Sequence, residues 1–375
     1  MSIPDSGRRS VAARAGVVDV ARLAGVAPST VSNVFNRPGT VSDQLTARVL
    51  DAARELRFTG ADPAGRSLRK GRTNAIGVVL RERLSYSFDD IAVIRLLQEI
   101  SEAADPRQQA LVIVPSFPEA GATAGPSIQH VAADGIIAYS LVGDDPLLEV
   151  VRRRHVPTVL VDSPREREAV VAGAHFVGID EAGSARSAVE HLLALGHRHI
   201  GILSTRLSAQ AAPGLATAAV QDASTASTAK GRLAGVRQAF ADAGMKRYEL
   251  PVVQGFISNA ETGRVGTHTL LDAAPRTTAV FAFSDALALG ARVAAADRGL
   301  SVPAELSIVG FDDSADAAEG LTTVHQPLRE KGRVATERLL ALVNGPETLL
   351  DGLEPATSIE LATALVVRGS TAPPA

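Results

Sequence analysis

The sequence predicts two domains of different class: a small all-α domain near the N-terminus and a large α/β domain built on parallel sheets. Helical periodicity runs from about residue 17 to residue 58, and a Gly-containing basic segment follows at 59–73. From residue 75 onward, short apolar runs alternate with helical stretches. With 375 residues, 46% of them hydrophobic, the chain can bury large cores, which excludes a disordered or fibrous protein.

The small domain should contain three short helices around one core. Gly25 stands where the first helix has to stop, Pro28 suits the first position of the second, and Ser42 is placed to cap the third. The residues expected in the shared core are Val20, Ala21, Ala24, Val31, Val34, Phe35, Leu45, Val49, Ala52 and Leu56.

The outer face of the second helix carries small polar side chains, with Pro28 and Ser29 at its start and Ser32, Asn33 and Asn36 further along. Two helices joined by a tight Gly turn, the second polar on its outside, have the geometry with which a helix enters the major groove of DNA. Periodicity alone fits any three-helix bundle equally well.

The charge of the chain is unevenly distributed. Residues 1–72 carry a net charge of +6 and the remainder −9, although the total is only −3. A basic segment attracts a polyanion such as duplex DNA, and an acidic body limits adhesion elsewhere along it. A solvated basic surface is the simpler alternative.

Residues 18–26 (VDVARLAGV) and 29–36 (STVSNVFN) resemble the headpiece of the lac repressor family (LacI/GalR type). The resemblance continues through Ala52–Leu56 and Arg66–Leu68 and extends, with less specific patterns, to residues 366–371. It implies a helix-turn-helix headpiece at 17–58 that binds double-stranded operator DNA, a hinge at 59–73, and a two-lobed periplasmic-binding-protein-like domain at 74–375.

The resemblance also assigns DNA contacts, but the sequence departs from the family at two positions. Asn33 is shorter than the side chain of many relatives and favours adenine, and Ala27 replaces the usual capping Ser, so about 1 kcal/mol of capping should be missing. The implied base-reading residues are Pro28, Ser29 and Asn33, and the implied phosphate contacts are Thr30, Ser32 and Asn36.

The hinge segment is too short and Gly-rich to form a stable helix in isolation. The resemblance implies that residues 63–69 become helical on operator DNA and pair with a second copy of the chain. Leu68 would then wedge into the minor groove beside Arg66. A plain flexible tether is the alternative. Residues 1–16 are expected to be a disordered tail.

Polar residues follow several expected strands of the large domain, where open parallel sheets place their ligands. For each of them a helix-capping role is as well supported as a ligand role. These residues are Asp162, Asp180, Asp285, Asp312 and Asp313. The expected lobes are residues 74–174 with 327–347, and residues 176–325 with 355–375.

The resemblance implies a small polar effector, a sugar or related metabolite, between these lobes. Arg232 in GRLAG (231–235) matches the family's pocket Arg, and Asp285 in FSDALALG (283–290) matches its pocket Asp. Such a pair binds adjacent hydroxyls or the edge of a base. Further implied effector residues are Asn259, Gln326, Asp162, Phe88, Asp90 and Thr228.

Several function classes are disfavoured. The absence of cysteine removes disulfides, thiolate metal sites and cysteine nucleophiles. No phosphate-cradling loop, Gly-x-Ser-x-Gly motif or metal-ligand cluster is found, so neither an enzyme nor a cofactor is expected. The Gly196–His199 motif is expected to end a helix rather than to bind metal.

The expected location is the cytoplasm, because no signal peptide or run of about 20 apolar residues is found. This argues against an exported solute receptor and a membrane partner. A constitutive DNA-binding protein with an inactive pocket stays open. The resemblance implies a homodimer, or a tetramer, acting as a repressor. The Ala/Ser/Thr-rich residues 204–229 are expected to form a mobile flap or insertion.

Overall fold

The computed structural model describes residues 15–37, 39–59, 71–80, 83–115, 131–141, 148–150, 153, 156–162, 174–208, 212–245, 250–255, 257–345 and 358–375. The chain forms two compact units, residues 1–73 and 74–375. Most of the expected N-terminal tail, and hinge residues 60–70, lie outside the described residues.

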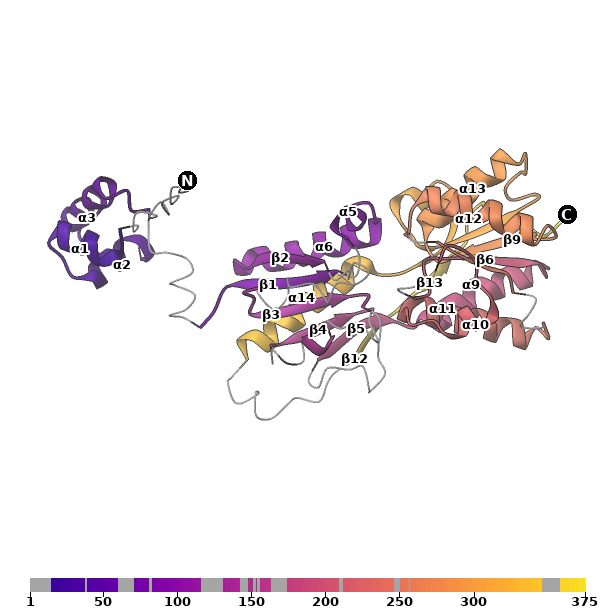
Figure 1. The fold of residues 1–375 in the computed structure, drawn as a ribbon, viewed down its shortest axis with the longest axis horizontal. Coiled ribbons are helices and arrows are strands. Elements are labelled where there is room, and N and C mark those ends of the chain that lie inside the picture. Colours follow the sequence, from indigo (N-terminus) through magenta and orange to yellow (C-terminus); the bar gives the residue numbers. More distant parts are fainter. Residues whose placement is uncertain are drawn as a thin grey trace, which may run out of the picture. The chain divides into compact units, whose positions relative to one another are not determined.

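The first unit contains the three predicted helices, α1 (Val17–Ala24), α2 (Pro28–Asn36) and α3 (Asp43–Glu55) (Figure 1). Gly25 ends α1 in a left-handed conformation with φ of 63°, which glycine adopts without a steric penalty. Arg48 of α3 donates to the Ala24 carbonyl at 2.6 Å. The turn between α1 and α2 is therefore held by its own backbone and by the third helix.

The core of this unit is small and apolar. Val20, Val31 and Val49, one from each helix, are fully buried, and Phe35 meets the ring of Phe58 edge-on at 5.4 Å. Ala27 stands at the N-cap of α2 and makes no side-chain capping hydrogen bond, as its methyl group requires.

The second unit contains two sheets. The six strands of the first, in order, are β12 (Ser358–Leu361), β5 (His175–Ile179), β4 (Thr158–Val161), β3 (Gly135–Tyr139), β1 (Ala75–Leu80) and β2 (Ala110–Pro115), all parallel. Helices α6 (Ile91–Ala104) and α14 (Leu328–Asn344) pack together against one face. Helix α5 (Leu84–Ser87) and the 3₁₀ turn η1 (Asp105–Arg107) flank α6. These elements form the first lobe.

The second lobe has seven strands and helices on both faces (Figure 1). Helices α9 (Glu181–Ala194) and α11 (Ser227–Asp242) cover one face, and α12 (Ala260–Ala273) and α13 (Asp285–Asp297) cover the other. The strands, in order, are β13 (Ala364–Val366), β11 (Thr322–His325), β10 (Ser307–Asp312), β9 (Ala279–Ala282), β6 (Ile200–Ser204), β8 (Val252–Gln254) and β7 (Gly214–Leu215). The short edge strands β7 and β13 are antiparallel to their neighbours. A 3₁₀ turn, η3 (Ala315–Ala318), follows β10.

The lobe boundaries differ from the expected ones at two strands. Strand β5 pairs with β4 and β12 in the first sheet, whereas residues from 176 onward were expected in the second lobe. Strand β12 also belongs to the first sheet, although residues 355–375 were assigned to the second. The chain passes between lobes after β5, after β11 and after β12. Strand composition does not encode which sheet a strand joins, because that depends on distant partners.

The expectation of a mobile flap at residues 204–229 is wrong for the described part of that segment. It contains β7, helix α10 (Ala218–Asp222) and the start of α11. The backbone of Leu207, whose side chain is fully buried, accepts hydrogen bonds from Ser224, Thr225 and Ala226 and donates to Gln254. The described residues of this segment are therefore part of the packed second lobe.

Among the residues that the structure describes, no helix is long and apolar enough to cross a membrane.

Candidate DNA interface and effector cavity

The outer face of α2 presents the residues expected to meet DNA. Pro28, Ser29 and Asn36 are exposed, Thr30, Ser32 and Asn33 are partly exposed, and Val31 is buried beneath them. Asn36 donates to the Ser32 carbonyl at 2.7 Å and to its hydroxyl at 3.1 Å. All six side chains are thus at least partly open to solvent on a helix whose Val31 is anchored in the core. The expected minor-groove residues Arg66 and Leu68 lie outside the described residues.

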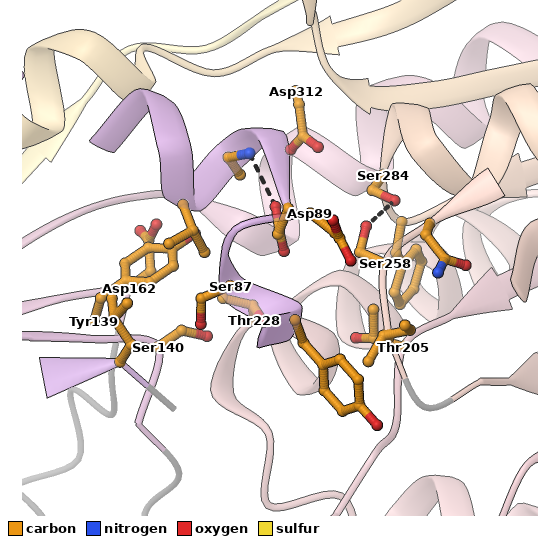
Figure 2. A pocket seen from close by; sticks show the side chains of 18 of the residues that line it. Ser87, Asp89, Tyr139, Ser140, Asp162, Thr205, Thr228, Ser258, Ser284 and Asp312 are labelled. Carbon is orange, nitrogen blue, oxygen red and sulfur yellow. Dashed lines mark hydrogen bonds between the residues drawn. The ribbon is translucent and has the colours of Figure 1, made fainter. Parts of the chain in front are cut away.

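A cavity of about 130 Å³ opens between the lobes, at the carboxyl ends of their strands. Figure 2 shows Tyr139, Ser140 and Asp162 of the first lobe on one side and Thr205, Ser258 and Ser284 of the second on the other. Its lining residues are mostly polar: Leu80, Tyr86, Ser87, Asp89, Asp90, Ala92, Val93, Tyr139, Ser140, Asp162, Thr205, Arg206, Thr228, Arg232, Ile257, Ser258, Asn259, Phe283, Ser284, Asp312 and Gln326.

Six of the eight sequence-predicted effector residues line this cavity, namely Asp90, Asp162, Thr228, Arg232, Asn259 and Gln326. Two of them also cap helices, because Asp90 accepts from the amide of Ala92 at 2.9 Å and Asn259 from that of Thr262 at 2.8 Å. Asp180, for which the sequence left the role open, caps α9 and does not line the cavity.

Asp285 and Phe88 do not line the cavity. The Asp285 side chain is fully buried behind it, where its carboxylate accepts from the Thr323 hydroxyl at 2.5 Å and from the Ser314 amide at 2.6 Å. Burial raises its pKa to about 6, although the Thr323 hydrogen bond opposes the shift. Phe88 is 56% exposed at the end of α5. Both residues were assigned to the effector site from their position in the sequence. Sequence position does not reveal that the Asp285 carboxylate already accepts hydrogen bonds from other residues.

Arg232 is held in place by groups of the protein itself. Its Nε donates to Glu181 at 2.7 Å, its Nη1 donates to the Phe283 carbonyl, and its guanidinium carbon lies 3.6 Å from the centre of the Phe311 ring. Burial alone would lower its pKa, but the carboxylates of Glu181 and Asp312 outweigh burial and raise it. The guanidinium is a permanently charged, pre-oriented hydrogen-bond donor.

Asp312 also lines this cavity and interacts electrostatically with Arg232, although sequence reasoning did not choose it as an effector residue. It ends β10 with a φ of 120° and accepts a hydrogen bond from Gln326. Burial, and next the charge of Asp285, raises its pKa well above the usual value. Its place after a strand was the available signal, but five aspartates shared that signal.

Backbone strain collects around the cavity. Ser140, Asp162, Asp312 and Asp313 all have positive φ, between 49° and 120°. Non-glycine residues hold such angles only where the surroundings enforce them, and such positions cluster at ligand sites. Burial also raises the pKa of the Tyr139 hydroxyl, with the nearby carboxylate of Asp162 adding to the shift. The rim is thus a pre-formed polar surface.

The Gly196–His199 motif ends α9 and leads into β6. His197 is buried among the hydroxyls of Thr278 and Ser307 and the Ala372 carbonyl, at 2.9 to 3.1 Å. Burial lowers its pKa. Its contacts fasten the C-terminal segment to the second lobe. Within the described ranges, no group of His, Cys, Asp and Glu is arranged to hold a metal ion.

Family comparisons identify both units. Residues 16–60 match the model for bacterial regulatory proteins of the lacI family, and residues 189–371 match that for a periplasmic binding protein-like domain. A helix-turn-helix-type transcriptional regulator of Mycolicibacterium smegmatis is 35% identical over 368 residues, covering 96% of this chain and 97% of the relative. The chain belongs to the lacI family.

Solved structures of lacI-family proteins agree with this fold. The lac repressor dimer bound to operator and the anti-inducer ONPF is 26% identical, covers 96% of this chain and 99% of its own, and superposes with a TM-score of 0.72. The complex of the regulator CelR with cellobiose is 27% identical, with coverage of 95% and 100% and a TM-score of 0.65. The predicted headpiece and two-lobed fold are confirmed, and this lacI-family chain is a DNA-binding transcription regulator rather than an enzyme.

Proposed function

We propose that this lacI-family regulator is a repressor whose affinity for operator DNA is controlled by a small, neutral, polar effector bound between the lobes. The observation that supports this most is the cavity itself, which is lined by Arg232 and Asp312 of the second lobe and by Asp162 of the first. A ligand that contacts both lobes stabilises one angle between them, and a change of that angle is what the DNA-binding unit can sense.

The charges of the cavity indicate the class of effector. Four aspartates line it (Asp89, Asp90, Asp162 and Asp312) against two guanidinium groups, and the partners outside the lining balance, because Lys331 pairs with Asp162 and Glu181 with Arg232. Even with Asp312 protonated, three carboxylates face two guanidinium groups. An anion such as a sugar phosphate would meet an excess of negative charge. Hydroxyl groups suit this lining, since they donate to carboxylates and accept from the guanidinium. A neutral sugar or polyol fits best, and the cellobiose complex of CelR supports this class.

On the DNA side, we propose a homodimer that places two copies of α2 in successive major grooves of a near-palindromic operator. Pro28, Ser29 and Asn33 would meet base edges, and Thr30, Ser32 and Asn36 would meet phosphates. The hinge residues Arg66 and Leu68 would lie in the minor groove between them. Repression requires only occupancy of a site near a promoter, and the dimeric lac repressor–operator complex supports this arrangement.

The test begins with a thermal-shift screen of neutral sugars, polyols, sugar phosphates and nucleosides. Each compound that shifts the melting temperature is then added to an operator-binding titration, with the operator selected from a random DNA library. A neutral polyhydroxyl compound should shift both measurements. If no compound changes DNA binding, the chain is a constitutive DNA-binding protein. A sugar phosphate as the strongest ligand would contradict the charge argument.

Arg232→Ala should abolish the response to that compound while unliganded operator binding changes by less than about threefold, because the helices expected to contact DNA belong to the other compact unit, residues 1–73. Lys230→Ala, an exposed change on the same helix outside the cavity, is the matched control and should respond as the wild type. A normal response of the Arg232 variant would place the effector elsewhere.

A further inference from the structure

A buried cation lies directly behind the effector cavity. Lys331 of α14 is 0% exposed and does not line the cavity. Its Nζ donates to Oδ2 of Asp162 at 2.7 Å and to Oε1 of Gln326 at 2.5 Å. Gln326 lies in the segment that leads from β11 of the second lobe to α14 of the first, and its Nε2 donates to Oδ1 of Asp312. The four side chains form one chain of hydrogen bonds between the lobes.

In this chain of hydrogen bonds, the donor and the acceptor of each bond are fixed. An ammonium group only donates hydrogen bonds, so the oxygen of the Gln326 amide has to face Lys331. The NH₂ group of the same amide is then turned toward Asp312, which has to accept. A glutamine amide without such a neighbour can be turned by 180° with little change in shape. Lys331 is thus the group that decides which end of the Gln326 amide Asp312 meets.

We infer that Lys331 is a positioning residue for the effector cavity: through the amide of Gln326 it makes Oδ1 of Asp312 a hydrogen-bond acceptor and leaves Oδ2 to meet the ligand. Among the described residues, Oδ2 of Asp312 has no hydrogen-bond partner, while the residue lines the cavity. The inference rests on the proposed function only for the role of Asp312 as an effector ligand. The orientation of the amide is a property of the unliganded chain.

The orientation of the Gln326 amide matters because Asp312 does not ionise easily. Burial and the carboxylate of Asp285 favour its protonated form, and the Gln326 hydrogen bond favours the carboxylate. If the amide turned its oxygen toward Asp312, two acceptors would oppose each other unless Asp312 took up a proton. An effector hydroxyl would then meet the neutral carbonyl oxygen of a carboxylic acid, a weaker acceptor than a carboxylate oxygen. The charged groups that act most strongly on Asp312 are Asp285 on α13, Arg232 on α11 and Asp90 at the start of α6.

The test follows the titration of Asp312 in the full-length, unliganded chain labelled with [¹³Cγ]aspartate. The Asp312 carboxyl resonance is the one lost in Asp312→Asn. Lys331→Met should raise the apparent pKa of Asp312 by about one unit, the size expected for losing one hydrogen bond to a carboxylate. Arg333→Met removes a cation from an exposed position of the same helix and should leave that pKa unchanged.

A second comparison separates the hydrogen-bond chain from a direct effect of charge. In a Gln326→Met background the amide is already absent, so adding Lys331→Met should raise the pKa of Asp312 no further. An equal rise in both backgrounds would mean that Lys331 acts through space, and the inference fails. The inference also fails if Lys331→Met alone leaves the titration unchanged.

Loss of Lys331 alone leaves the Asp162 carboxylate buried without its cation, which can prevent folding. In that event Asp162→Asn is compared with Asp162→Asn/Lys331→Met, and the same rise is expected between them. An effector screen without a hit would count against the proposed function but would leave this titration unaffected, so the two can fail separately.

Discussion

At the scale of single residues, the two aspartates Asp285 and Asp312 show how burial and hydrogen bonding divide similar side chains between structure and site. Both are aspartates at the carboxyl edge of the second sheet, and burial raises the pKa of both. Both carboxylate oxygens of Asp285 accept hydrogen bonds, from Thr323 and Ser314. In Asp312, within the part of the chain that the structure describes, only Oδ1 does so, from Gln326, and the residue lines the cavity. The partner atoms, not the residue type, determine the role.

The raised pKa of Asp285 predicts a pH dependence of stability. The pKa of Asp285 is about 6 in the folded chain against an ordinary value of 3.8, which is expected in the unfolded chain. The folded state therefore binds the proton more tightly. Stability therefore falls as pH rises from about 4 to about 6, by up to about 3 kcal/mol. In Asp285→Asn this loss is absent, so its free energy of unfolding relative to wild type should increase across that window. Urea unfolding between pH 4 and 7.5 measures it.

Asp316→Asn, at an exposed aspartate of the following 3₁₀ turn, is the control and should follow the wild-type profile. Parallel profiles for the wild type and the Asp285 variant would contradict the prediction.

Asn33 is the residue from which we expect base preference. Asn33→Ala should cost about 1–3 kcal/mol on the selected operator and remove the preference at one base pair, because a bidentate contact to adenine is lost. Ser32→Ala, at an expected phosphate contact, should weaken binding about equally on all sequences. Binding titrations on operators with single base-pair changes compare the two. If Asn33→Ala lowered affinity equally for all operator variants, Asn33 would not be a base-reading residue.

At the scale of elements, the helices of the second lobe approach each other closely through glycine. A Cβ at Gly263 of α12 would lie 2.2 Å from the Leu287 carbonyl oxygen of α13, and one at Gly290 of α13 would lie 2.0 Å from that of Ala260. Backbone cannot move away without separating the helices. This packing fixes α13, whose N-cap Ser284 lines the cavity together with its partner Ser258.

Two glycines of α12 should therefore respond oppositely to alanine. Gly263→Ala should destabilise the second lobe by about 3 kcal/mol, because the new methyl group overlaps backbone. Gly266→Ala meets only Leu203 and Val253 side chains at 3.4 and 3.6 Å, and should stabilise by up to about 1 kcal/mol through helix propensity. Thermal and urea unfolding of the full chain measure both. Equal effects would mean that α12 and α13 are less closely packed than described.

At the scale of the whole molecule, function depends on joining parts that are distant in the sequence. The chain passes between lobes three times, and the cavity draws on Asp90, Asp162, Arg232 and Gln326 from four separate regions. The charge is divided as well, with the basic part of the sequence confined to residues 1–72. This charge distribution favours binding of a polyanion at the N-terminal part of the chain over binding along the rest of it.

Leu68→Ala tests the link between these parts. An apolar wedge acts only where the hinge is ordered on a specific site, so the variant should lose at least about tenfold in operator affinity, or about 1.4 kcal/mol, and little affinity for random DNA. Binding titrations on both DNAs at one salt concentration provide the measurement. Equal losses of affinity for operator and random DNA would mean that the hinge is only a flexible tether.

Local patterns were enough for most of the fold but for only part of the site. Helix stops and apolar periodicity located α1, α2 and α3, and the alternation of apolar runs with helical stretches after residue 75 predicted the parallel α/β class, because these features are set within a few residues. The resemblance supplied Arg232. It did not distinguish Asp312 from Asp285, since that choice depends on Thr323 and Ser314.

By itself, the sequence determined a basic three-helix domain, an α/β domain and the family to which they belong, because periodicity, glycine turns and charge are local properties of the chain. Only the tertiary structure decided which sheet β5 joins, which carboxylate reaches the cavity, and that Lys331, on a helix with many exposed charges, is a buried cation between two lobes. Each of these depends on partners that folding brings together from distant parts of the sequence, and such partners leave no mark on the local pattern.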